Sequence, residues 1–187
     1  LSPHAHARFN NAIPLRHPHI TWPQSVARHP GYMKLLAGFD RVWAVSEASR
    51  RDLLEFWRWQ GVAKLPPVEV LSLGADFNGM ARVTARVVPT DAARLLCVGI
   101  LEPRKNQAFL LQAGMALWDA GMDFELHFAG RVNPHFGPPI LARLKELKRR
   151  YPALHYHDAP DDAAMAALYA NARASVFPTL AEGCGLP

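Results

Sequence analysis

The sequence has little cysteine, no long apolar run and no low-complexity segment. Only two of its 187 residues are cysteines, Cys97 and Cys184, and they form no Cys-x-x-Cys pair. This spacing argues against a disulfide framework or a zinc site built on cysteines, and it indicates a reducing compartment. A membrane span needs roughly 18 or more consecutive apolar residues, and no stretch of the sequence approaches that length. We therefore expect a cytoplasmic protein.

Negative charge is scarcer than positive charge. The sequence has 21 Lys and Arg against 16 Asp and Glu, which gives a formal net charge of +5 and a pI of about 9.6. Such a balance attracts phosphate esters, nucleic acid or acidic lipid, although an ordinary basic surface has the same composition. The basic residues are spread along the chain without an aromatic-interleaved stripe. We therefore expect no nucleic-acid partner.

Residues 92–187 show a regular alternation of strand and helix patterns. Short apolar runs are separated by segments of about 10 to 15 residues with helical periodicity, which is typical of a parallel sheet with helices on both faces. The predicted strands are Arg94–Gly99, Phe124–Ala129, Leu154–His157 and Ala174–Pro178, and the predicted helices are Asn106–Ala120, Pro138–Arg150 and Asp161–Asn171.

The earlier part of the chain is also α/β, but less regular. A strand over residues 41–46 is followed by a helix over residues 47–60, for which Ser46 is the predicted N-cap. A second strand is predicted at residues 68–71. The first 35 or so residues are rich in His, Pro and Asn, so we predict mostly loops there.

The weak apolar pattern between these parts predicts two domains. We place the first domain at residues 1–76, a linker at 77–91 and the second domain at 92–187. The sequence starts at Leu1 rather than Met and stops at Pro187 within a glycine-rich turn. We therefore expect a piece of a longer protein, with both domains incomplete.

Candidate ligand-binding residues follow three of the predicted strands. In an open parallel sheet, ligands bind beyond the carboxyl ends of the strands. Arg104 and Lys105 follow the first strand, Gly130 and Arg131 follow the second, and Leu180–Pro187 follows the last. Taken singly, these are equally a solvated charge pair and ordinary turn glycines. Together they predict a site for a phosphorylated, hydroxyl-rich ligand.

Several segments resemble the signatures of family 4 retaining glycosyltransferases of the GT-B fold. Val98–Asn106, Phe128–Arg131 and Ala181–Pro187 carry the resemblance in the second domain. Val45–Leu53 and Val70–Asp76 are similar to the end of that family's N-terminal domain. The resemblance implies an α/β, GT-B architecture of two Rossmann-like domains, the first on the acceptor side and the second on the nucleotide-sugar side.

The resemblance also implies roles for individual residues. Arg104 and Lys105 would hold the donor diphosphate and stabilise the charge that develops on it, and Glu182 would contact donor-sugar hydroxyls; we expect these three to be catalytic. No metal and no cofactor are expected, because the donor phosphate is held by protein groups. The remaining donor-binding positions would be Gly99, Gly130, Arg131, Gly183, Cys184 and Gly185.

The implied activity is transfer of a hexosyl unit, with retention, from a nucleotide diphosphate sugar to a glycan or a lipid-linked acceptor. Mannose is the favoured sugar, because the Glu-Pro-Arg-Lys-Asn sequence of residues 102–106 is common in relatives resembling mannosyltransferases. Lipid-linked acceptors would bring the protein to the cytoplasmic membrane surface, and the basic segment Arg143–Arg150 could attach it there. A solvated helix face explains that segment equally simply.

Two departures from the family pattern leave an alternative open. The second acid of the family's paired-glutamate motif would fall beyond Pro187, so we expect this part of the protein to be inactive alone. Asn10 and Asn11 stand where the family usually has His-Asp, and amides cannot replace those groups in proton transfer. A degenerate module that binds a nucleotide sugar without turnover is therefore the alternative.

Nine histidines also raise the question of a metal site. His155 and His157 are spaced to point to the same side of one strand, but no third ligand stands at a suitable spacing in the sequence. We therefore predict that these histidines pack or form hydrogen bonds, and that no metal is bound.

Overall fold

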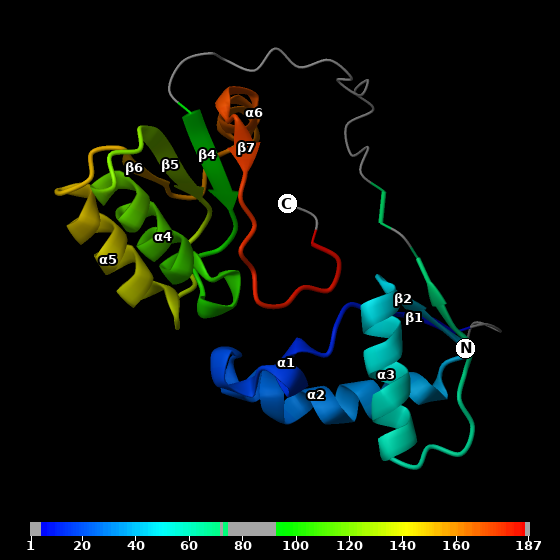
Figure 1. Cartoon of the computed structure of the whole chain (residues 1–187). Coiled ribbons are helices and arrows are strands. Elements are labelled where there is room, and N and C mark those ends of the chain that lie inside the picture. The colour runs from blue at the N-terminus through cyan, green and yellow to red at the C-terminus, as the bar shows by residue number, and fades with distance from the viewer. Residues whose placement is uncertain (1–4, 72, 75–92, 186–187) are drawn as a thin grey trace. The chain divides into compact units, whose positions relative to one another are not determined.

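The structure is a computed structural model that describes residues 5–71, 73–74 and 93–185. The chain forms two compact units, which we treat separately (Figure 1). The first unit comprises residues 1–80 and 181–186, and the second comprises residues 81–180 and 187. The predicted linker, residues 77–91, lies outside the described residues.

The first unit contains a parallel three-stranded sheet with the order β1-β2-β3. Helix α3 follows β2, and Ser46 caps it as predicted, because its Oγ accepts a hydrogen bond from the Ser49 N–H at 3.1 Å. The buried core includes Phe9, Leu53 and Trp57. The elements are β1 (His6–Phe9), α1 (Ile13–Arg16), η1 (Pro18–Ile20), α2 (Pro23–Leu35), η2 (Leu36–Gly38), β2 (Arg41–Ala44), α3 (Glu47–Trp59) and β3 (Val68–Val70).

The prediction of loops over the first 35 residues was wrong. That segment forms strand β1 and helices α1 and α2. Helix α2 contains Pro30 and buries only Met33 fully, so the sequence carries almost no amphipathic signal. Tertiary contacts hold it instead: the Trp57 indole N–H donates a hydrogen bond to the Met33 carbonyl at 2.7 Å.

The second unit contains a parallel four-stranded sheet with the order β6-β5-β4-β7. The predicted alternation is confirmed, although the last strand is shorter than predicted. The elements are β4 (Ala93–Val98), η3 (Pro103–Lys105), α4 (Gln107–Asp119), β5 (Phe124–Ala129), α5 (Gly137–Lys148), β6 (Leu154–His157), α6 (Asp162–Asn171) and β7 (Ala174–Ser175).

Helices cover both faces of this sheet. Leu110 and Leu111 of α4, with Leu144 and Leu147 of α5, form one core with the strands, and α6 packs on β4 through a separate cluster. After β6 the chain crosses over to the other side of β4 to form β7. The sheet order therefore reverses between β4 and β7, and such switch points are where open α/β sheets bind ligands.

Within the described part of the chain, no helix is long and apolar enough to cross a membrane.

Candidate functional site

The carboxyl ends of β4 and β5 meet without intervening side chains. Gly99 and Gly130 have φ values of +152° and +151°, which residues with a Cβ rarely adopt. A Cβ on Gly130 would lie well inside 3.0 Å of the Gly99 carbonyl oxygen, so only glycine fits there. The Gly99 N–H donates to the Ala129 carbonyl at 2.9 Å, which holds the two strand ends together. This edge of the sheet therefore presents bare backbone.

The turn after β4 carries the two predicted phosphate-binding cations. Arg104 and Lys105 lie in η3, and Asn106 ends the turn with a left-handed φ of 57°. The Arg104 Nη2 donates to Glu102 Oε1 at 2.6 Å, and the Asn133 side-chain amide donates to Glu102 Oε2 at 3.1 Å. Both charged side chains of the pair are mostly buried, with 20% and 14% exposed, so the guanidinium is held in a defined place.

Lys105 lies along the same edge. Its side-chain carbons are 3.4 Å from where a Cβ of Gly99 would be, and its ammonium is 5.2 Å from the centre of the Phe177 ring. Burial raises the pKa of the Cys97 thiol to about 11, and the positive charge of Lys105 acts in the opposite direction. Lys105 therefore lies at the switch point between β4 and β7, in contact with Gly99 after β4 and near Phe177 after β7.

The loop after β7 is tied to this turn. The Leu180 N–H and the Thr179 hydroxyl both donate to the Arg104 carbonyl, at 2.9 and 3.1 Å, and the Asn106 side chain donates to the Pro178 carbonyl at 3.2 Å. The predicted meeting of successive strand ends is therefore confirmed within the second unit. That these groups bind a ligand remains a prediction.

Arg131 follows Gly130, and its side chain is exposed. Its carbonyl accepts from the Leu101 N–H at 2.8 Å, which extends the pairing of the two strand ends. The sequence analysis missed Glu102, Asn133 and Gln107, which shape the turn; Gln107 is buried, and its amide donates to the Ile100 carbonyl at 2.9 Å. Glu102 and Gln107 bind within the turn itself and Asn133 reaches it from a distant segment, and contacts of neither kind leave a periodic signal in the sequence.

Glu182, Gly183, Cys184 and Gly185 group with the first unit. A Cβ on Gly183 would overlap the Asn10 carbonyl oxygen, and this oxygen accepts from the Ser49 hydroxyl at 2.7 Å. The thiol-bearing Cys184 is exposed, and Gly185 has a φ of +72°. These predicted site residues therefore lie in a bend outside any helix or strand.

Asn10 and Asn11 have local structural partners. Asn11 Oδ1 accepts from the Ile13 N–H at 3.1 Å just before α1, which is the bond of an Asx-turn. The Asn11 carbonyl lies 3.0 Å from His29 Nε2, which brings an imidazole from α2 beside this segment. Burial lowers the pKa of His29, and its hydrogen bond to the Asn11 backbone opposes this.

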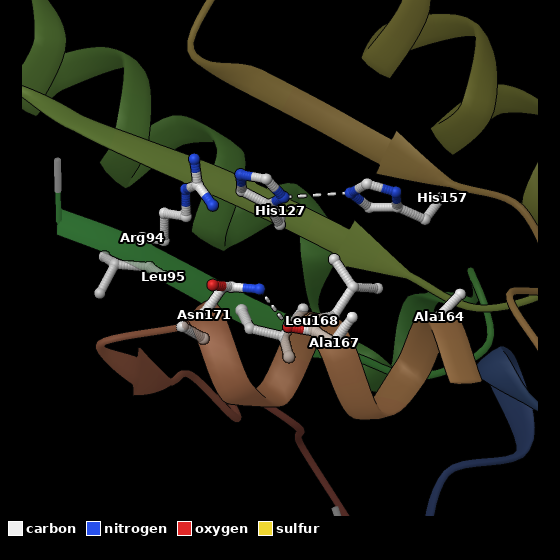
Figure 2. A pocket seen from close by; sticks show the side chains of 10 residues that line it. Arg94, Leu95, His127, His157, Ala164, Ala167, Leu168 and Asn171 are labelled. Carbon is white, nitrogen blue, oxygen red and sulfur yellow. Dashed lines mark hydrogen bonds between the residues drawn. The ribbon is translucent and has the colours of Figure 1, made fainter. Parts of the chain in front are cut away.

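A group of histidines lies on the α6 side of the second sheet, where Figure 2 shows His127 facing His157. His127 Nδ1 is 3.0 Å from His157 Nε2, so the prediction of a hydrogen-bonded histidine is confirmed. No third ligand stands at a suitable spacing in the sequence, but the pairing of β5 with β6 brings Glu125 and His127 beside His155. Burial and the neighbouring His127 lower the pKa of both His155 and His157.

A family model described as glycosyl transferases group 1 matches residues 92–187, which is just over half of the chain. The chain belongs to the group 1 glycosyltransferases. The matched region contains the Gly99–Asn106 turn, Gly130 and the Glu182 segment, so the family match covers every predicted site residue.

Among curated proteins, this group 1 glycosyltransferase is similar to the serotype-specific mannosyltransferase WbdA of Escherichia coli. The two are 30% identical over 193 residues, covering 95% of this chain and 23% of WbdA. A second WbdA sequence from the same organism is 29% identical over the same share of both chains. The chain thus spans about a quarter of the length of the curated relatives it matches.

Solved structures establish the fold as GT-B. A trehalose-6-phosphate synthase, OtsA, matches with a TM-score of 0.67 at 14% identity, covering 88% of this chain and 46% of that one. Sucrose-phosphate synthase from Thermosynechococcus elongatus matches with a TM-score of 0.65 at 16% identity, covering 95% of this chain and 45% of that one. The predicted α/β, GT-B fold is therefore confirmed.

Proposed function

We propose that this protein is a family 4 retaining glycosyltransferase that transfers mannose from GDP-mannose to a glycan or a lipid-linked acceptor. The observation that carries the proposal is the turn holding Arg104 and Lys105, which lies at the switch point of the second sheet beside the bare backbone of Gly99 and Gly130. Two cations next to glycine backbone at strand ends suit a diphosphate that must be approached closely.

The chemistry follows from where charge develops. When the bond between the sugar and the diphosphate breaks, negative charge grows on the departing phosphate oxygen. The Arg104 guanidinium and the Lys105 ammonium are the groups we assign to stabilise that charge. Glu102 and Asn133 fix the Arg104 side chain beforehand, so little reorganisation is needed during the reaction.

The other predicted residues complete the donor site in this proposal. Glu182 would contact hydroxyls of the sugar, and the backbone amides of Gly183, Cys184 and Gly185 would face the sugar or the phosphate. Gly130 and Arg131 would lie near the nucleotide. Neither a metal ion nor an organic cofactor takes part, because the cations of the turn supply the positive charge.

The comparisons support this assignment without deciding its details. WbdA is named a mannosyltransferase, and one structural neighbour is described as bound with UDP-2-fluoro glucose. Another is described in connection with glycosyltransfer with retention. Retention and a nucleotide-sugar donor are therefore chemistries known for proteins of this fold, and mannose is the sugar indicated by the more similar relatives.

Membrane attachment would use the basic segment Arg143–Arg150. On and after α5, Arg143 pairs with Glu146 at 2.8 Å and Arg150 pairs with Asp119 at 3.1 Å. These pairs neutralise part of the charge that would attract an anionic bilayer. We expect weak, salt-sensitive binding to vesicles containing anionic lipid, measured by sedimentation at low and high salt.

Donor binding and transfer test the proposal. In titration calorimetry with the intact protein, GDP should bind more tightly than UDP; stronger binding of UDP would contradict the assignment of GDP-mannose. With GDP-mannose and a glycan acceptor, the product should keep the anomeric configuration of the donor, measured by NMR. An inverted product would refute retention.

The alternative, a degenerate binding module, is motivated by Asn10 and Asn11. It predicts nucleotide-sugar binding without hydrolysis or transfer. Turnover at ordinary rates by the intact protein would remove this alternative, whereas tight binding with no product would favour it.

A further inference from the structure

Three potential metal ligands meet on the α6 side of the second sheet. Glu125 and His127 lie two residues apart on β5 and so point to the same face, and His155 is the Cα partner of His127 on β6. One ligand atom from each of the three lies within 4.8 Å of the other two. The rings of His127 and His155 stack with their centroids 4.4 Å apart.

The His127 and Glu125 atoms already have the spacing of two ligands on one ion. His127 Nε2 and Glu125 Oε2 are 3.1 Å apart. In a tetrahedral zinc site with bonds of about 2.0 to 2.1 Å, neighbouring ligand atoms lie about 3.3 Å apart. Only His155 has to swing closer, and as a half-buried residue on the edge strand β6 it has room to do so.

Two further residues contact the proposed ligands without binding the ion: His157 contacts His127, and Arg94 contacts Glu125. If His127 binds through Nε2, its Nδ1–H faces His157 Nε2 at 3.0 Å and can donate to it (Figure 2). Metal-binding histidines almost always donate their second ring N–H to a neighbouring acceptor, usually a carboxylate, a carbonyl or water. On the other side, Arg94 Nε donates to Glu125 Oε2 at 2.6 Å and orients the carboxylate.

The cluster lies away from the proposed phosphate site. Glu125 is near the start of β5, and Gly130 follows its end. Ala129 lies four residue steps along the strand from Glu125, which corresponds to about 13 Å. An ion here would lie on the face of the sheet rather than at the carboxyl ends of the strands.

We propose that Glu125, His127 and His155 bind a divalent zinc-class metal ion, with a water completing a tetrahedral shell. Two imidazoles and one carboxylate suit zinc, and more generally the later first-row divalent ions. The ion would link β5 to the edge strand β6. The proposed site does not depend on the proposed transferase activity.

Direct metal titration of the intact protein tests the proposal. Co²⁺ serves as the probe because tetrahedral Co²⁺ absorbs strongly in the visible, and Zn²⁺ should displace it. We expect one Co²⁺ per chain with a tetrahedral spectrum, and a higher unfolding temperature in the presence of Zn²⁺. Failure to observe a tetrahedral site, or binding of several weak ions without saturation, would overturn the proposal.

Matched substitutions separate this site from the other histidines. His127→Gln and His155→Gln should each weaken binding at least about 100-fold, because each removes a ligand, and His157→Leu should weaken it about 10- to 100-fold, because it removes only an outer-shell acceptor. His19→Gln, in the first unit, should leave the affinity unchanged.

Circular dichroism establishes that each variant folds. His155→Gln lies on the edge strand, so it keeps the test decisive should His127→Gln fail to fold. Unchanged Co²⁺ affinity in folded His155→Gln would refute the assignment, and so would equal losses in His155→Gln and His19→Gln.

Discussion

Substitution of Gly130 by alanine tests the close approach of strands β4 and β5 that creates the bare edge of the candidate site. The new Cβ would meet the Gly99 carbonyl carbon and oxygen, which are backbone atoms and cannot rotate away. Gly130 also has a φ of +151°, a conformation that alanine rarely adopts. The strain in φ costs about 1 to 3 kcal/mol, and overpacking against fixed atoms costs about 1 to 3 kcal/mol more.

The sum, about 2 to 6 kcal/mol, is a large part of the stability of about 5 to 15 kcal/mol typical of a domain. We expect the free energy of unfolding of the second unit to fall by this amount, measured by urea denaturation with hydrogen exchange of β4 and β5 peptides as the readout. GDP binding should weaken as well, because relief of the overlap moves the two strand ends apart.

Gly121→Ala is the matched control. Gly121 lies in the same unit with a φ of +85°, but a Cβ there meets no atom within 4 Å. It should cost only the conformational term, about 1 to 2 kcal/mol. The reasoning would be refuted if the two variants lost the same stability, or if Gly130→Ala unfolded at the wild-type urea concentration.

Further predictions concern single side chains. Glu102→Gln should lower kcat/KM about fivefold in the transfer assay, because a charged partner of Arg104 becomes a neutral one. Glu69→Gln weakens the exposed pair with Arg41 and should change kcat/KM little. Equal effects of the two substitutions would contradict a positioning role for Glu102. At pH 8 a thiol reagent should label exposed Cys184 quickly and Cys97 only after denaturation, since burial raises the pKa of Cys97 to about 11; two fast thiols would contradict the buried position of Cys97. The pKa of His29 is lowered in the fold, so the unfolded chain binds more protons than the folded one near and below pH 6.5. The free energy of unfolding of the first unit should therefore fall as the pH drops through 6.5. This fall should be smaller in His29→Gln, and a steeper fall in that variant would show the sign to be wrong.

The second unit was largely predictable because its sequence pattern and its packing agree. Strands β5 and β6 have the bounds that their apolar runs predict, and α6 begins after Asp161, whose carboxylate caps it by accepting from the Ala164 N–H at 2.8 Å. Such signals are local and come from short-range physics. Strand β7 is shorter than predicted, because the apolar run continues into the loop that binds the Arg104 carbonyl.

The first unit was less predictable because its helices depend on distant contacts. Helix α2 contains a proline and few buried residues, and no segment periodicity reveals that Met33 accepts a bond from Trp57. The same limit applied to the histidine cluster. His127 and His155 lie far apart in the sequence, and only the pairing of β5 with β6 places them side by side.

The candidate site was predicted at the level of residues but not of contacts. The rule that ligands bind beyond strand ends selected Arg104, Lys105 and Gly130. It gave no indication that Glu102 holds the Arg104 guanidinium within the turn, or that Asn133 from a distant loop donates to Glu102, because such side-chain contacts follow no sequence pattern.

The most direct test of the proposed function is transfer from GDP-mannose by the intact protein carrying Arg104→Ala and Lys105→Ala together. If the two cations stabilise the departing diphosphate, turnover should fall by at least about 10² to 10³-fold, while circular dichroism and the unfolding midpoint stay near those of the parent. Arg58→Ala, an exposed change on α3, is the control and should leave turnover unchanged. Turnover of the double variant within a few fold of the parent would show that the diphosphate is bound elsewhere and would contradict the assignment of the site.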